Sequence, residues 1–235
     1  MDKIALLIGH PGRPEEYIPG VKKDIKSYKK FLISPYGGRW IKEEILEIYE
    51  KDVDYVKSVI NELSKCKYEF VLTVFSGHGN FSIIKNERRL YLGDEYIYES
   101  ELRNLAKKQL IIIDSCAGIE DEVLIKEEAI MESFTREEKD YRKIYEEYLK
   151  ICPEQEILLY SSSENEYSED IGIGGLYTVS LLETIYENTK YGIFNALIAH
   201  ELASEKVIKK SRGKQHPNYL STRRSGKKLP LSLKV

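Results

Sequence analysis

Four runs dominated by apolar residues recur along the chain, and each ends in small or polar residues. They are "KIALLIG" at 3–9, "FVLTVFSGHG" at 70–79, "QLIIIDSC" at 109–116 and "EILLYSS" at 156–162. A run that is apolar at nearly every position, rather than at alternate positions, is typical of a strand buried on both faces. These runs predict the inner strands of a sheet that is covered on both sides.

Segments with helical spacing of apolar residues separate these runs. They cover 21–32, 41–66 with a break near Lys51, 100–107, 137–151, 177–188 and 194–210. Strands that alternate with helices predict an α/β fold with a doubly wound, mainly parallel sheet and helices on both faces. In such a sheet, ligands bind beyond the carboxyl ends of the strands. Both "SGHG" and "DSCAG" are expected there, at strand ends.

The length of 235 residues suits one domain over 1–235. No apolar run approaches the roughly 18 residues of a membrane span, and the start "MDKIALLIGHPG" lacks the pattern of a signal peptide. The odd number of cysteines favours free thiols over a disulfide framework. We expect a cytoplasmic protein that does not act at a membrane, with Cys66 and Cys152 in the core or at an interface.

The net charge of -3 conceals an asymmetry along the chain. Residues 119–170 hold 17 acidic and 6 basic residues, whereas 206–235 hold ten basic and no acidic ones. The two segments can attract each other. The basic tail lacks regularly interleaved aromatic residues, so nucleic-acid binding is disfavoured. Nucleic-acid binding by the tail nevertheless remains one functional hypothesis, and it predicts salt-sensitive binding.

His78 and Cys116 are the candidate catalytic pair, because two different strands deliver them to the same edge of the sheet. A thiol becomes a strong nucleophile when a neighbour removes its proton, and an imidazole suits that task. The backbone amides of Gly79 and Cys116 are candidates to face a developing oxyanion. The alternative is that Cys116 is an ordinary core residue, since cysteine is among the most buried residue types.

The other motifs in the sequence do not predict a metal or dinucleotide site. The histidines and cysteines show no zinc spacing, so no metal site is predicted from them. The "GIGG" motif at 172–175 has Tyr177 where a dinucleotide fingerprint needs glycine. We expect His10 in a loop and His200 in a helix.

The order of these motifs resembles the caspase-like cysteine peptidases, and within them the metacaspases and their bacterial relatives more than the animal caspases. The resemblance rests on the following segments in turn: "IALLIG", "IPGVKKDIKSYKKFL", "SGHG", "LIIIDSCAG", "ILLYSSSENE", "GGLYTVSLLE", "QHPNYL" and a final strand "LPLSLKV". It implies a caspase-like fold in which His78 and Cys116 form the catalytic dyad and Gly79 with Cys116 supplies the oxyanion amides.

The resemblance also implies specificity for Arg or Lys before the scissile bond, as in metacaspases. The positions that match their acidic pocket are Asp24, Ser76 and Asp114, and two carboxylates in one pocket favour a guanidinium between them. Ile18 stands where the animal enzymes place a pocket arginine. The alternatives are a solvated helix face for Asp24 and a strand-end cap for Asp114.

Two further features of the family are its calcium requirement and its linker between two parts of the domain. Calcium is possible, but the available acidic residues (Asp94, Glu95, Asp121, Glu122) do not match the family's calcium ligands one by one, and no cofactor is required by the sequence. Residues 119–155 correspond to the linker that caspases often cut, with Arg136, Lys139, Arg142 and Lys143 as candidate self-cleavage points. We favour an amphipathic helix there, because Tyr141, Ile144, Tyr145 and Tyr148 share one face.

The sequence therefore predicts a cysteine endopeptidase that cleaves protein substrates after Arg or Lys. A substrate strand is expected to add to a sheet edge near Tyr167 to Asp170. Control by a partner, ion, self-cleavage or signalling nucleotide is expected, and the resemblance suggests bacterial stress or anti-phage defence. The alternative is a catalytically silent binding or scaffold module on the same fold.

Overall fold

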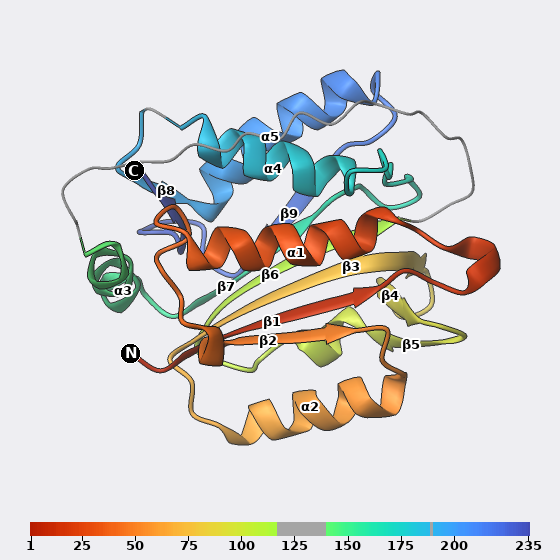
Figure 1. The fold of residues 1–235 in the computed structure, drawn as a ribbon, viewed down its shortest axis with the longest axis horizontal. Helices are drawn as coiled ribbons and strands as arrows, with labels where there is room; N and C mark the ends of the chain where they lie inside the picture. Colours follow the sequence, from red (N-terminus) through yellow and green to blue (C-terminus); the bar gives the residue numbers. More distant parts are fainter. Residues whose placement is uncertain (117–139, 189) are drawn as a thin grey trace.

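The central sheet has the strand order β2-β1-β3-β6-β7-β9 in the computed structural model, which describes residues 1–116, 140–188 and 190–235 (Figure 1). Its strands are β1 (Lys3–His10), β2 (Ile45–Tyr49), β3 (Phe70–Ser82), β6 (Lys108–Cys116), β7 (Gln155–Tyr160) and β9 (Asn218–Ser221). Neighbouring strands pair in parallel except β7 and β9, which are antiparallel. The predicted mainly parallel sheet is confirmed.

Helices cover both faces of this sheet, as predicted. In Figure 1, α1 (Gly20–Ile33), α4 (Leu176–Tyr186) and α5 (Ala196–Lys210) lie on one side of the sheet, and α2 (Val53–Lys65) lies on the other. The side of α2 also carries the hairpin of β4 (Glu87–Leu92) and β5 (Glu95–Tyr98). A second, two-stranded sheet pairs β8 (Ile193–Asn195) with β10 (Pro230–Leu233), so the expected final strand forms outside the central sheet.

The strands are apolar throughout because alternate residues enter two separate cores. In β1, Ala5 and Leu7 belong to the core under α1, α4 and α5, whereas Leu6 and Ile8 belong to the core over α2. The same alternation continues in β3, β6 and β7. Each inner strand is therefore held on both faces, which fixes the register at the strand ends.

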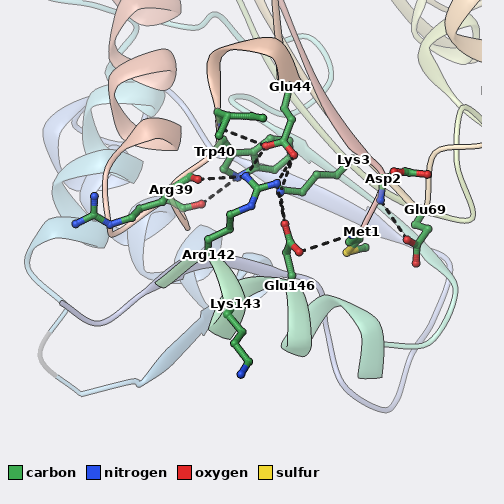
Figure 2. A network of polar contacts seen from close by, with 12 residues as sticks. Met1, Asp2, Lys3, Arg39, Trp40, Glu44, Glu69, Arg142, Lys143 and Glu146 are labelled. Atoms are coloured by element: carbon green, nitrogen blue, oxygen red, sulfur yellow. Dashed lines mark hydrogen bonds and ion pairs between the residues drawn. The ribbon is translucent and has the colours of Figure 1, made fainter. Parts of the chain in front are cut away.

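Helix α3 (Tyr141–Ile151) is attached to the start of the chain by a cluster of charges (Figure 2). The Lys3 side chain is fully buried, with its Nζ 3.1 Å from Glu44 Oε1 and 2.6 Å from Glu146 Oε1. Arg142 also bonds both carboxylates. The amphipathic helix expected in 119–155 forms from Tyr141 onward, with Tyr141 and Tyr145 buried, whereas 117–139 lie outside the described residues. Ile144, expected on the same face, is exposed, and Leu149 is buried in its place.

Two predicted helices are wrong. Residues 45–49, placed in a helix by their apolar spacing, form strand β2, because Ile45 and Ile48 pair with β1 and enter opposite cores. The predicted helix at 100–107 is only a single 3-10 turn, η3 (Glu99–Leu102), after which Asn104 takes a positive φ of 61°. A short apolar segment does not distinguish a helix from a strand that is completed by its neighbours.

The neighbourhood of "SGHG" also differs from expectation. The motif lies inside β3 rather than at its end, because β3 continues to Ser82 and pairs with β4 from Gly79 onward. His10 is the last residue of β1 and not a loop residue, whereas His200 lies in α5 as predicted. The sequence analysis missed β4, β5, β8 and β9, which are short or lie at the margins of the sheets.

Candidate active site

His78 and Cys116 lie side by side on adjacent parallel strands. In the pairing of β3 with β6, Ser76 is the register partner of Asp114, and His78 is the register partner of Cys116. The description of Cys116 is limited to its backbone. Gly79 sits directly beside this pair, and a Cβ placed on it would lie 2.7 Å from Ser115 Cβ. A side chain larger than that of glycine would therefore push the two strands apart at the candidate dyad.

A backbone carbonyl selects the tautomer of the neutral His78 ring. Its Nε2 lies 2.6 Å from the carbonyl oxygen of Glu16. Because a carbonyl only accepts hydrogen bonds, Nε2 carries the proton, and the lone pair of the neutral ring belongs to Nδ1. Nδ1 is thus the atom that can take a proton from a thiol. The sequence analysis missed Glu16, since a main-chain contact of this kind leaves no signal in residue type.

The loop that carries Glu16 is held by His10. The His10 Nδ1 accepts hydrogen bonds from the backbone amides of Gly12 and Gly93, both at 3.2 Å. Burial lowers the pKa of His10, and the nearby His78 lowers it further, while Glu50 raises it. A neutral His10 keeps both bonds, because a protonated Nδ1 accepts none. His10 therefore connects the loop after β1 with the turn between β4 and β5.

Asp24 lies on the core face of α1 and not in solvent. The residues around it on the helix, Val21, Ile25 and Tyr28, are buried at helical spacing, and Asp24 is only 2% exposed. Its carboxylate accepts hydrogen bonds from the Ser76 hydroxyl at 2.7 Å and the Gly175 amide at 3.0 Å. The alternative of a solvated helix face is therefore wrong.

Asp114 is buried beside Asp24. It accepts hydrogen bonds from the Thr178 hydroxyl at 2.6 Å and amide at 3.0 Å, and from the Ser168 hydroxyl at 3.2 Å. Asp114 thereby caps the first turn of α4, a structural role that coexists with a role in a pocket. Burial raises the pKa values of Asp24 and Asp114, and for Asp24 the charge of Asp114 adds to the effect.

A third carboxylate, Asp170, was not among the predicted pocket residues. It is half-buried and accepts hydrogen bonds at 2.9 Å from the amides of Gly20, at the start of α1, and Gly172. Its charge raises the pKa of Asp24 further. The loop between Asp170 and the start of α4 needs glycine at two positions. A Cβ on Gly174 would lie 2.4 Å from Asp24 Oδ1, and one on Gly175 would lie 2.4 Å from Asp114 Oδ2.

The other residues singled out in the sequence are two cysteines, candidate calcium ligands and candidate cleavage points, and those that the structure describes do not form a site with the dyad. Cys66 is exposed at the end of α2 and is therefore not a core residue, whereas Cys152 is buried as a core residue. Among the described residues, no group of histidine, cysteine and acidic side chains is arranged to hold a metal ion. Asp94 pairs with Arg13 at 3.0 Å, and Asp121 and Glu122 lie outside the described residues, as do Arg136 and Lys139. Within the described ranges, none of the helices is both long and apolar enough to cross a bilayer.

Comparison with known structures identifies the fold. The chain is similar to a protein from Geobacter sulfurreducens, with a TM-score of 0.62 and 15% identity, over 96% of this chain and 95% of the other. It is equally similar to caspase-1 from Spodoptera frugiperda, with a TM-score of 0.62 and 15% identity, over 93% of this chain and 88% of the other. No curated protein sequence matches the chain.

The sequence profile of the caspase domain matches residues 2–228, which is nearly the whole chain. The predicted resemblance and the caspase-like fold are thereby confirmed. The profile includes both strands of the candidate dyad and the segments that surround the buried carboxylates. The chain therefore belongs to the caspase domain family of cysteine peptidases.

Proposed function

We propose that this chain is a cysteine endopeptidase that cleaves after Arg or Lys, with His78 and Cys116 as its catalytic dyad. The single observation that carries the proposal is the register of β3 and β6. It pairs His78 with Cys116 and, two residues earlier on the same strands, Ser76 with Asp114. A reactive pair and an acidic pocket therefore share one edge of the sheet.

The proposed reaction follows from the tautomer of His78. With Nε2–H donated to the Glu16 carbonyl, Nδ1 takes the thiol proton of Cys116. The thiolate attacks the scissile carbonyl carbon, and the amides of Gly79 and Cys116 stabilise the oxyanion. His78 then gives its proton to the leaving amine, which departs and leaves an acyl-enzyme thioester. A water molecule, deprotonated by His78, hydrolyses the thioester and restores the thiol.

The specificity is proposed from the position of the carboxylates. Two residues of a strand span about 6.6 Å, a distance that an extended Arg or Lys side chain can cover from the scissile bond to Asp114. Asp24 and Asp114 have raised pKa values because both are buried, and a guanidinium between them would stabilise their ionised forms. An acidic substrate residue would instead add a further negative charge to this pocket.

The proposed substrate edge near Tyr167 to Asp170 gains support from the backbone. Leu176 N donates to the Glu169 carbonyl at 2.7 Å and Ile171 N donates to the Gly174 carbonyl at 3.0 Å, around the antiparallel bridge of Asp170 with Gly175. In this pattern the amide and carbonyl of Asp170 point away from its partner strand. They face the side on which an extended substrate can add by main-chain hydrogen bonds.

The test is a panel of fluorogenic peptides with Arg, Lys or Asp before the scissile bond, with and without calcium. We expect cleavage of the Arg and Lys peptides, no cleavage of the Asp peptide, and complete loss of turnover in Cys116→Ala. An arginyl chloromethyl ketone should label Cys116 in the wild type and leave Cys66 and Cys152 unlabelled. Absence of both turnover and labelling would favour the silent scaffold instead.

A separate proposal concerns the regulation of the activity. The family includes regulated bacterial proteases, and the basic residues Arg223, Arg224 and Lys227 are exposed between β9 and β10, where a phosphate can reach them. We expect a signalling nucleotide to raise activity or thermal stability in an anti-phage or stress response. Titration of linear and cyclic nucleotides against both quantities checks this, and no change in either would exclude it.

A further inference from the structure

Gln215 is a fully buried amide in the loop between α5 and β9, within the "QHPNYL" segment. Its Nε2 donates to the Ser161 carbonyl at 2.8 Å and to the Ser168 hydroxyl at 3.0 Å. Its Oε1 accepts from the Glu169 amide at 3.0 Å. These bonds join it to both ends of residues 161–169, the segment that leaves β7 and returns toward the carboxylates.

The first consequence concerns the pocket. The Ser168 hydroxyl, which accepts from Gln215, lies 3.2 Å from Asp114 Oδ1 and donates to it. Ser168 is 5% exposed and Ser161 is fully buried, with the two hydroxyls 2.7 Å apart. A continuous hydrogen-bonded path therefore runs from Gln215 through Ser168 to Asp114. Gln215 does not itself contact Asp114. Its side-chain amide instead determines the position of the Ser168 hydroxyl, which stabilises the ionised form of Asp114.

The second consequence concerns the proposed substrate edge. Gln215 engages the amide of Glu169, and α4 engages its carbonyl through Leu176 N. Successive residues of an extended segment direct their main-chain groups to opposite sides. With Glu169 turned inward, the main-chain groups of Ser168 and Asp170 are turned outward. Gln215 therefore fixes the rotation of this segment as well as its position.

Three further hydrogen bonds, all made by His216, connect the same loop to residues 161–169. The His216 amide and Nδ1 lie 2.7 Å from the two oxygens of Glu166, and the Ser163 hydroxyl donates to the His216 carbonyl at 2.8 Å. These groups are partly exposed, whereas the bonds of Gln215 lie in the interior. A directional bond in a buried site tolerates less displacement than one at the surface. Gln215 is thus the residue on which the inner side of the segment depends.

We propose that Gln215 is a positioning residue for substrate binding: it holds residues 161–169 so that Ser168 stabilises Asp114 and the main chain of Ser168 and Asp170 faces the substrate. This inference rests on the proposed peptidase function. It assigns to Gln215 an effect on the recognition of the basic residue and not on the reactivity of the thiol.

The experiment compares Gln215→Met with Gln109→Met, a matched control. Gln109 is equally buried, accepts from the Leu105 amide at 3.0 Å and donates to the Leu102 carbonyl, but it lies near the start of β6, away from the candidate dyad. Methionine keeps the length of glutamine and removes its hydrogen bonds. Gln215→Glu serves as a second variant, because it retains the acceptor for Glu169 if Gln215→Met does not fold.

We expect Gln215→Met, or Gln215→Glu, to lower kcat/KM for an Arg peptide at least tenfold, mainly through KM. The rate of Cys116 alkylation by iodoacetamide should stay within twofold of the wild type. Amide exchange should accelerate in 161–176 only. Gln109→Met should lose thermal stability while kcat/KM stays within twofold.

Two results separate the failure of this inference from that of the proposed function. If the wild type cleaves Arg peptides and both Gln215 variants cleave them with an unchanged KM, the positioning role is overturned and the peptidase function stands. If the wild type neither cleaves peptides nor reacts with the arginyl probe, the peptidase function fails and the inference fails with it.

Discussion

At the scale of single residues, Asp24 and Asp114 carry the proposed specificity. Both are nearly fully buried, and burial raises the pKa of each, so both lose their charge at a higher pH than an exposed carboxylate does. A guanidinium needs the ionised forms. We therefore expect binding of an arginine ligand to weaken as the pH falls through the raised pKa values.

The first prediction is measured with arginine amide as a competitive inhibitor between pH 5 and 9. We expect its Ki in the wild type to rise as the pH falls. Asp24→Asn should weaken binding about tenfold at pH 8, equivalent to about 1.4 kcal/mol, and should flatten the profile. Ser76→Ala removes a hydrogen bond that lowers the pKa of Asp24, so its profile should move to higher pH. A Ki in the wild type that does not change with pH would contradict the proposal.

His200 gives a second prediction that does not depend on activity. It is 2% exposed in α5, with Nδ1 2.7 Å from the Tyr177 hydroxyl, and burial lowers its pKa to about 4. As the pH falls, His200 binds a proton near pH 6.5 in the unfolded chain but only near pH 4 in the folded chain. The free energy of unfolding therefore decreases as the pH falls from 6.5 toward 4. The full effect is about 3 kcal/mol.

The measurement is urea unfolding of the wild type and His200→Asn at pH 7 and pH 4.5. The variant should be less stable at pH 7, because buried contacts are lost. The difference in free energy of unfolding between the two proteins should shrink or reverse at pH 4.5, since only the wild type has a histidine at 200 that is protonated more readily in the unfolded chain. The same difference at both pH values would show that His200 is protonated equally in the folded and unfolded chains.

At the scale of elements, α3 depends on the buried ammonium of Lys3. The Lys3 Nζ contacts Glu44 and Glu146 and lies 4.9 Å from the centre of the Trp40 ring (Figure 2). Removing one partner of a buried ion pair costs about 3 kcal/mol or more, because the remaining charges stay buried. Lys3→Met should therefore destabilise the fold by about 3 kcal/mol in urea unfolding.

The control for this prediction is Lys29→Met. Lys29 lies 2.8 Å from Glu47, but its side chain is 42% exposed, and exposed pairs contribute about 0–1 kcal/mol. Equal losses in the two variants would mean that Arg142 and the N-terminal ammonium of Met1 suffice to neutralise Glu44 and Glu146.

The elements also show how far the sequence alone predicts the fold. The inner strands β1, β3, β6 and β7 were predictable because burial on both faces requires an uninterrupted apolar run, and α1, α2, α4 and α5 because one apolar stripe suffices for a helix. Strand β2 was not, since "ILEIY" also fits a helix and only its pairing with β1 decides. The hairpin of β4 and β5 was missed although it has a local signal, since Leu92 pairs with Glu95 across a two-residue Gly93-Asp94 turn in which Gly93 has a positive φ.

The candidate site divides in the same way. His78, Cys116, Asp24, Ser76 and Asp114 were selected by residue type and by family resemblance, and the structure brings their backbone positions together at one edge. Glu16 acts through its carbonyl, and Gln215 acts through an amide that any buried glutamine would possess. Neither has a signature in the sequence, because their importance lies in what the fold places beside them.

At the scale of the molecule, the two halves of the chain that flank 117–139 are joined by many contacts. Strands β6 and β7 pair in register over six residues, from Lys108 with Gln155 to Ile113 with Tyr160. One core includes residues from β1, α1, α3, α4 and α5, and therefore from both halves. The charge cluster of Lys3, Glu44, Arg142 and Glu146 adds a second link. Neither half contains a complete core of its own.

The proposed site is divided between the same halves. The dyad, Asp24 and Asp114 belong to the first half, whereas Ser168, Asp170 and Gln215 belong to the second. A chain cut between positions 117 and 139 should therefore keep its activity only while the halves remain together. If a recognition site for a specific protease is introduced in that segment and cut, the product should elute from gel filtration as one species near 27.3 kDa.

Urea should separate these pieces together with the loss of peptide cleavage, in one transition, because docking of the second half completes the pocket. The same cut in a chain carrying Lys3→Met should separate at a lower urea concentration, since α3 then loses its buried cation. Cut Lys29→Met should behave like the cut wild type. Separation of the pieces without denaturant, or cleavage that persists after they separate, would show that the first half binds substrate without Ser168, Asp170 and Gln215.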